Sequence, residues 1–150
     1  IVFKINLFFF FLQLYNSTFI SMRDIVIDAS GILEFLLNQQ NKDFVMNKIG
    51  NNTLVAPTCL PFEIGNAISK LIRRNLISAF DGVAIFHEFA KIPTRLIEPD
   101  IPNSIVIADE TKSYAYDCYY INLAKQYSFP LFTLDQNMKE NAIMQGVTCL

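Results

Sequence analysis

The strongest constraint on the fold is a repeated change in hydrophobic periodicity from residue 24 onward. Short β-branched or apolar runs, which are typical of buried strands, alternate with longer segments whose apolar residues recur at helical spacing. The expected strands are 24–28, 53–56, 95–97, 131–133 and 147–149. The expected helices are 31–37, 44–49, 60–72, 78–91, 105–112, 116–127 and a last one that carries Met138 and Ile143. This alternation predicts βαβ crossovers and therefore an α/β fold, with a mostly parallel sheet covered on both faces.

Size, charge and cysteine content exclude several classes of protein. The chain has 150 residues, of which 52% are hydrophobic and 17% charged, so one packed domain is expected and a disordered or collagen-like chain is not. A formal net charge of -2 means that bulk cationic attraction cannot be the main way of holding a nucleic acid. Cys59, Cys118 and Cys149 form no C-x-x-C pair, and His87 is the one histidine, so a structural zinc site is not expected. Sparse cysteines also suit a reducing compartment, which predicts a cytoplasmic protein.

Residues 1–21 differ from the rest of the chain. They contain no acidic residue and one base, Lys4, and they include the apolar run from Phe8 to Leu12. A signal peptide wants small residues before its cleavage site, and a membrane-spanning helix needs about 20 mainly apolar residues, whereas polar side chains interrupt this segment. Because Met22 directly precedes the first strand pattern, we favour upstream sequence translated by mistake, or a disordered apolar extension, over a lipid or export role. The folded unit is then 22–150, with no stable membrane association expected, and a natural mass that includes 1–21 would contradict this interpretation.

Four acidic side chains are expected at one edge of the sheet. Asp28 ends the first strand and Asp135 follows the fourth, and the carboxyl ends of parallel strands meet at the same edge. Glu63 and Asp117 each lie in the first turn of a helix that follows a strand or loop. Chemistry in such sheets gathers where the strand order reverses, so these acids form a candidate site.

Each of the four acids also has a purely structural explanation. The helix macrodipole favours acids in a first turn, which would explain Glu63 and Asp117, and both Asp28 and Asp135 could cap the helices that follow them. Asp117, however, shares a helical face with Tyr120 and the apolar residues beyond it, so it should point toward the packed side rather than toward water. Four like charges at one edge raise each other's pKa unless a cation binds, and together they indicate a cation site.

Four spaced motifs stand in order along 22–150. They are IVIDAS at 25–30, PFEIGNAI at 61–68, YDCYYINLA at 116–124 and LFTLD at 131–135. Together they resemble the PIN-domain ribonucleases, and most closely the VapC-type toxins of bacterial and archaeal toxin–antitoxin pairs. The resemblance implies a three-layer α/β/α sandwich with a mostly parallel sheet, and an endoribonuclease that uses Mg2+ or Mn2+. It also implies an RNA substrate, a small antitoxin that covers the active-site groove, and a homodimer.

The resemblance assigns roles to particular residues. The catalytic, metal-binding acids would be Asp28, Glu63, Asp117 and Asp135, and the residues near the metal would be Ser30, Asn66 and Thr133. Asn137 stands two residues beyond the last acid, where some relatives carry a further acid, so a firmly held second metal is left open.

The chemistry of the acids can be argued independently of any resemblance. Carboxylates without His or Cys suit Mg2+, which prefers hard oxygen ligands. One ion would lower the pKa of a bound water and aim it at phosphorus, and a second would stabilise the leaving oxygen. We expect Asp28 and Asp135 nearest the first ion, with Asp117 between the two sites. Glu63 would lie toward the second site or orient water.

Basic residues suggest where RNA could lie. Lys70, Arg73 and Arg74 follow Glu63 on its expected helix, so an RNA backbone could run along that face. Alternatively, these cations simply complement the dipole at the end of the helix. Tyrosines near Asp117 could stack on unpaired bases, although helix packing explains most of them better. The cysteines are expected to be small buried hydrophobes.

Other classes of protein share parts of this pattern. A haloacid dehalogenase-type phosphatase also begins with a strand ending in Asp, but it wants a second Asp where this chain has Ser30. A receiver domain wants paired acids after the first strand and a later Lys, which the pattern does not supply. A PIN nuclease for RNA processing, outside any toxin pair, stays open. So does a non-catalytic interaction module that uses the apolar helical segments 33–37 and 83–89 to bind a partner.

Overall fold

The computed structural model describes residues 23–37 and 40–150, and the prediction made for 1–21 lies outside these described residues. The strands are β1 (Asp24–Ile27), β2 (Thr53–Pro57), β3 (Thr94–Ile97) and β4 (Leu131–Phe132). The helices are α2 (Ala29–Leu36), α3 (Lys42–Ile49), α4 (Leu60–Arg73), α5 (Ala79–Phe89), α6 (Ile101–Thr111), α7 (Ala115–Tyr127) and α8 (Gln136–Met144). Within these ranges no helix is long and apolar enough to span a membrane.

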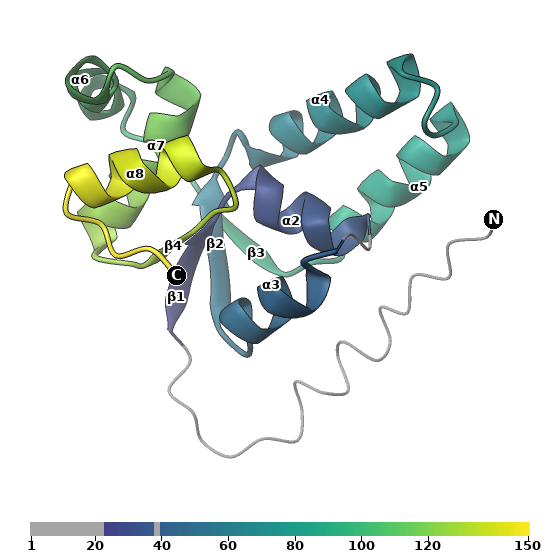
Figure 1. The fold of residues 1–150 in the computed structure, drawn as a ribbon, viewed down its shortest axis with the longest axis horizontal. Helices are drawn as coiled ribbons and strands as arrows, with labels where there is room; N and C mark the ends of the chain where they lie inside the picture. Colours follow the sequence, from purple (N-terminus) through teal and green to yellow (C-terminus); the bar gives the residue numbers. More distant parts are fainter. Residues whose placement is uncertain (1–22, 38–39) are drawn as a thin grey trace.

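The four strands form one parallel sheet in the order β3-β2-β1-β4. β1 lies inside the sheet, with Ile25 paired to Leu54 of β2 and Val26 paired to Leu131 of β4. Val26 and Ile27 are completely buried, because helices cover both faces. Figure 1 shows α6, α7 and α8 on one side of the sheet and α2 and α3 on the other. The predicted α/β fold, a three-layer sandwich with a parallel sheet, is confirmed.

Most element boundaries differ from the prediction by one or two residues, but one predicted strand is absent and one helix begins much earlier. The strand expected at 147–149 is wrong, since a single bridge joins Cys149 to Leu131. β4 is only two residues long, so it offers the C-terminal segment little length to pair with. α6 begins at Ile101 rather than at 105, because the Asp100 carboxylate accepts a backbone hydrogen bond in the first turn and caps the helix four residues earlier than expected.

α4 and α5 pair as a helical hairpin that extends beyond the sheet (Figure 1). Asn75, in the turn between them, has a left-handed φ of 56°. The two helices approach closely at Gly82, where an added Cβ would lie 2.9 Å from side-chain atoms of both Ile68 and Ile72. A larger residue at position 82 would therefore force the Ile68 and Ile72 side chains to shift.

The two apolar segments considered as partner surfaces differ in exposure. In 33–37 the side chains are buried or half-buried, because α2 packs against α3, α4 and α5, so exposure of this segment was wrongly predicted. In 83–89, Val83 is 59% exposed while Phe89 is buried. Phe80, one turn before Val83 on α5, is 83% exposed. An apolar surface therefore exists on α5 and not on α2.

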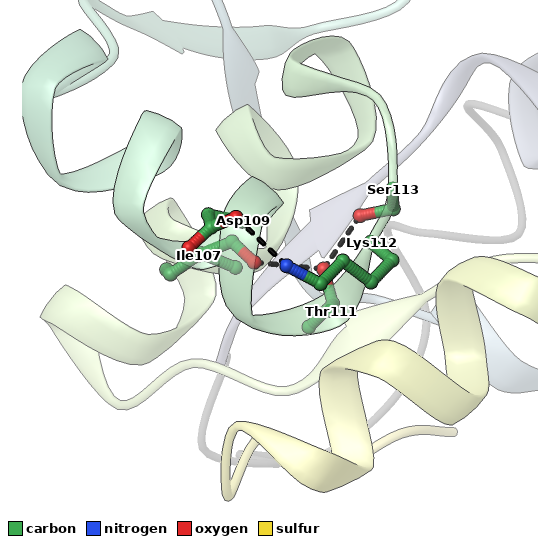
Figure 2. A network of polar contacts seen from close by, with 5 residues as sticks. All are labelled: Ile107, Asp109, Thr111, Lys112 and Ser113. Carbon is green, nitrogen blue, oxygen red and sulfur yellow. Dashed lines mark hydrogen bonds and ion pairs between the residues drawn. The ribbon is translucent and has the colours of Figure 1, made fainter.

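A polar network closes the turn between α6 and α7 (Figure 2). Lys112 ends α6 with a left-handed φ of 53°, and its ammonium lies 2.8 Å from the Asp109 carboxylate. The Thr111 hydroxyl lies 2.6 Å from that of Ser113, which in turn lies 3.2 Å from the Cys118 sulfur. These contacts fix the first turn of α7, which bears one of the four acids.

Candidate active site

The acidic residues predicted to form a site lie around the carboxyl edge of the sheet. β1 has β2 on one side and β4 on the other, so Asp28, which follows β1, stands where the strand order reverses. Asp135 follows β4, Glu63 lies in the first turn of α4, and Asp117 lies in the first turn of α7. Four elements thus deliver one carboxylate each.

Asp28 is a buried carboxylate, 4% exposed, surrounded by hydrogen-bond donors. Its Oδ1 accepts from the Ser30 hydroxyl (2.7 Å) and from the Gly31 N–H (3.1 Å). Its Oδ2 accepts from the Thr133 hydroxyl (2.9 Å). Burial raises the pKa of Asp28 above its ordinary 3.8, because desolvation disfavours the charged form, while the hydrogen bonds act to lower it.

The two hydroxyls beside Asp28 are oriented by the chain that follows β4. The Leu134 N–H donates to Ser30 Oγ (3.0 Å), and the Asp135 N–H donates to Thr133 Oγ1 (2.9 Å). Because each hydroxyl already accepts from a backbone N–H, its own proton is directed to Asp28. Ser30 and Thr133, expected near a metal, therefore lie against the buried carboxylate and link it to the loop that carries Asp135.

The capping explanation also holds for two of the acids. Asp28 accepts the Gly31 N–H at the start of α2, and Asp135 Oδ1 accepts the Met138 N–H (2.9 Å) at the start of α8. Asp135 is exposed, as an ordinary cap is, whereas Asp28 is buried. Capping by itself therefore accounts for Asp135 better than for Asp28, since a cap gains nothing from burial.

Glu63 is held by two donors that the sequence pattern did not predict. The Tyr120 hydroxyl donates to Glu63 Oε1 (2.9 Å), and the Cys59 thiol donates to the same oxygen (3.2 Å). Burial and the neighbouring Glu63 raise the pKa of Cys59 to about 12, so the sulfur keeps its proton. Cys59 was expected to be a small buried hydrophobe, but it is half-buried and donates a hydrogen bond. Spacing in the sequence could have indicated these two donors. Cys59 lies one helical turn before Glu63, and Tyr120 lies one turn after Asp117.

Asp117 is half-buried on the inward side of α7, as its helical spacing predicted. Burial raises the pKa of Asp117, and the negative charges of Asp135 and Asp28 raise it further. Burial likewise raises the pKa of Glu63; its two hydrogen bonds oppose this, and the charges of Asp28 and Asp117 add to it. The Asp117 carboxylate therefore lies within electrostatic range of the other three acids, and Glu63 lies within range of Asp28 as well.

The donor chemistry of this group fits a hard divalent cation. All four side chains offer carboxylate oxygens, and a cation would relieve the repulsion that raises their pKa values. In the part of the chain that the structure describes, no three Asp, Glu, His or Cys side chains converge as ligands of one metal ion. Oxygens of Asp28, Glu63 and Asp135 are instead engaged by protein donors. The four acids are candidate ligands rather than a formed metal cage.

Comparison with protein families accounts for this arrangement. Residues 25–144 match the profile of the PIN domain family. The chain belongs to the PIN domain family. The match runs from β1 to the end of α8, so it contains all four acids, and the resemblance inferred from the four motifs is confirmed.

Individual relatives of this PIN domain include nucleases. Ribonuclease VapC12 from Mycobacterium tuberculosis is 28% identical over 119 residues, which span 78% of this chain and 91% of VapC12. The structure of PAE2754 from Pyrobaculum aerophilum aligns with a TM-score of 0.66 at 16% identity, covering 85% of this chain and 91% of that one. VapC20 from Mycobacterium tuberculosis, a toxin that cleaves the sarcin–ricin loop, aligns with a TM-score of 0.56 at 10% identity, covering 77% and 93%. At such identities the two structures establish the fold alone.

The remaining predicted site residues lie on α4 of this PIN domain. Asn66 is exposed, one turn beyond Glu63. Lys70, Arg73 and Arg74 are also exposed, and none of them forms an ion pair within the described residues. Lys70 and Arg73 occupy the last turn, where they also complement the helix dipole.

Proposed function

We propose that this PIN domain is a divalent-metal-dependent endoribonuclease of the VapC type, and the toxin of a type II toxin–antitoxin pair. What carries the proposal is the set of carboxylates that raise one another's pKa around the buried Asp28, in a chain of the PIN family. The 28% identity to ribonuclease VapC12 supports an RNA substrate. An RNA target and three unpaired cysteines fit a cytoplasmic location.

The four acids would have different roles in metal binding. Mg2+ or Mn2+, when bound, lowers the pKa of a water and neutralises charge on the phosphate. Asp28 would be the most firmly held ligand, because two hydroxyls and a backbone N–H donate to it. Asp135 would also lie nearest the first ion, Asp117 would lie between the two sites, and Glu63 would lie toward the second site or orient the attacking water.

RNA binding in this proposal is local. The net charge of -2 gives no general attraction to a polyanion, so the phosphates must be held by the exposed cations of α4. Lys70, Arg73 and Arg74 lie two to three turns beyond Glu63 on the same helix. A strand that crosses the carboxyl edge of the sheet could therefore continue along α4.

The exposed apolar side chains of α5 support the proposal that this protein binds other proteins. Phe80 and Val83 present large side chains to solvent, which supports an antitoxin contact or a homodimer surface on this hairpin. The same observation favours the second candidate function, a catalytically inactive interaction module. An RNA-processing nuclease outside any toxin pair is the enzyme alternative, and a short neighbouring reading frame with a DNA-binding pattern would favour the toxin.

Cleavage of a fluorogenic single-stranded RNA tests the proposal. We expect the wild type to cleave in Mg2+ or Mn2+, to stop in EDTA, and to recover when the ion is restored. Asp28→Asn should bind RNA without cutting it. Full activity in EDTA would remove the mechanism, and an inactive wild type that retains binding to a protein partner would favour the interaction module.

The variant needs a matched control, because Asn places an amide where Asp28 accepts hydrogen bonds. Asp109→Asn changes an exposed acid that pairs with Lys112 at the far end of α6, so it should cleave like the wild type. Asp117→Asn serves as a second active-site variant, because no described hydrogen bond depends on that carboxylate.

A further inference from the structure

Two uncharged donors from separate elements meet on one oxygen of Glu63. Tyr120 comes from α7 and is completely buried, and its hydroxyl lies 2.9 Å from Oε1. Cys59 stands immediately before α4, and its sulfur lies 3.2 Å from the same oxygen. The sequence pattern did not predict that either residue contacts one of the four acids.

This arrangement leaves the second oxygen of Glu63 available. No hydrogen bond from the described residues reaches Oε2, while both donors converge on Oε1. A free Glu side chain samples many rotamers, and ordering it costs conformational entropy. Because two donors from different elements hold Glu63, its side chain is already ordered in the folded protein without a bound cation or RNA.

Tyr120 also connects two of the acids. It follows Asp117 by three residues on α7, so the two side chains lie on one side of that helix. The Tyr120 hydrogen bond therefore ties Glu63 of α4 to the helix that carries Asp117. This bond restrains the Glu63 carboxylate relative to the helix that carries Asp117.

The contact between Tyr120 and Glu63 also has a purely structural explanation. A buried hydroxyl needs a partner in any protein, and Glu63 could simply satisfy Tyr120. A backbone carbonyl would do so without placing a charge near Asp28 and Asp117. The convergence of a second donor, Cys59, on the same oxygen is not needed to satisfy Tyr120.

We infer that Tyr120 and Cys59 are positioning residues, which hold Glu63 by one oxygen so that its other oxygen faces the cation or the attacking water. The inference rests on the proposed function. It goes beyond that function by naming residues outside the acidic quartet on which the metal site depends.

Four variants test the inference through metal affinity, kcat and KM. Tyr120→Phe removes one hydroxyl, and Tyr127→Phe removes an exposed hydroxyl from the far end of α7 as its control. Cys59→Ala removes the thiol donor, whereas Cys59→Ser keeps a donor in its place. Mn2+ affinity is measured by calorimetric titration without RNA, and kcat and KM are measured on the fluorogenic RNA.

We expect Tyr120→Phe to weaken Mn2+ binding and lower kcat by about 10- to 100-fold, the range for residues that orient metal ligands, with KM nearly unchanged. Cys59→Ala should also weaken Mn2+ binding and lower kcat. In Cys59→Ser both quantities should return toward the wild-type values. If Tyr120→Phe matches Tyr127→Phe in both Mn2+ affinity and kcat, the inference is overturned, whatever its Tm. Should Tyr120→Phe fail to fold, wild-type Mn2+ affinity and kcat in Cys59→Ala overturn it instead.

Failure of the proposed function gives a different result. A wild type that binds Mn2+ but cleaves no RNA contradicts the nuclease, while a loss of Mn2+ affinity in Tyr120→Phe and Cys59→Ala still supports the positioning role. A wild type that binds no Mn2+ overturns both.

Discussion

Asp117 is the least restrained of the four carboxylates, because it is half-buried and no described hydrogen bond reaches it. Burial and the charges of Asp135 and Asp28 oppose its ionisation. We therefore expect Asp117→Asn to raise the Tm by a few degrees in EDTA near neutral pH. The rise in Tm that Mn2+ gives the wild type should be lost in this variant. Differential scanning fluorimetry with and without Mn2+ measures both effects.

Asp109→Asn is the matched control for this experiment. It also removes one acid, but from an exposed ion pair with Lys112, so neither the Tm in EDTA nor the Mn2+ response should change appreciably. A Mn2+ response that survives in Asp117→Asn would contradict a metal site that uses this residue.

The raised pKa values predict an unusual dependence of stability on pH. Asp28, Glu63 and Asp117 bind protons more tightly in the folded chain than at their ordinary pKa values of 3.8 for Asp and 4.5 for Glu. Their contribution therefore makes the metal-free protein more stable as the pH falls from about 7.5 toward about 5. Urea titrations in EDTA across this range measure the free energy of unfolding. The slope should be shallower in Asp117→Asn, and an equal slope in both proteins would count against electrostatic crowding.

At the scale of single residues, the sequence predicted where the four acids lie but not which side chains hold them. Strand ends and helix starts follow from local patterns, so the positions of Asp28 and Asp117 could be deduced. The partner of Glu63 could not, because its bond to Tyr120 spans 57 residues and depends on how α7 lies over the sheet. The hydroxyls of Ser30 and Thr133 were predicted near a metal, and their contact with Asp28 emerged only from the fold.

The α4–α5 hairpin depends on one close helix contact, which gives a prediction about stability. Gly82→Ala gains about 1 kcal/mol of helix propensity. It also places a Cβ 2.9 Å from Ile68 and Ile72, and overpacking of this kind costs about 1–3 kcal/mol. We expect a net loss of about 1 kcal/mol, measured by urea unfolding.

Gly65→Ala provides the control on the neighbouring helix. A Cβ at this position meets no atom within 4 Å, so the substitution should stabilise the protein by about 1 kcal/mol through helix propensity alone. Equal effects of the two substitutions would contradict a tight contact at Gly82.

Elements were predictable where periodicity is strong and less so where one side chain sets the boundary. α4 and α7 begin and end close to the predicted residues because their apolar patterns are long. The start of α6 depends on the Asp100 cap, which precedes the first apolar repeat. The prediction of a strand at 147–149 was wrong because a strand needs a neighbouring strand of matching length to pair with. A local sequence pattern does not show the length of that neighbour.

For the whole molecule, the distribution of charge predicts how RNA binding responds to salt. The net charge is -2, and the exposed cations of α4 are the proposed phosphate contacts. Replacing Lys70, Arg73 and Arg74 together by Ala removes three charges. Because each phosphate contact with a single strand contributes about 0.7 to the slope of log K against log salt, the slope should fall by about 2. Fluorescence anisotropy with labelled RNA in EDTA measures it.

Lys112→Ala tests whether this effect is local. Lys112 lies at the end of α6, on the other side of the sheet from the α4–α5 hairpin (Figure 1), and it pairs with Asp109. Its loss should leave the salt slope unchanged. A slope that is insensitive to all three α4 substitutions would place the RNA backbone elsewhere.

The hydrogen bond between Thr133 and Asp28 joins residues 105 positions apart, and the strand beside β1 is not complete until Phe132. During synthesis, β1 emerges from the ribosome long before β4 can join it. A translation product that stops before residue 131 lacks both β4 and Asp135, so no chain of that length carries the full acidic set. If the protein is a toxin, its producer is protected from copies that stop before β4 by the order in which the strands are made.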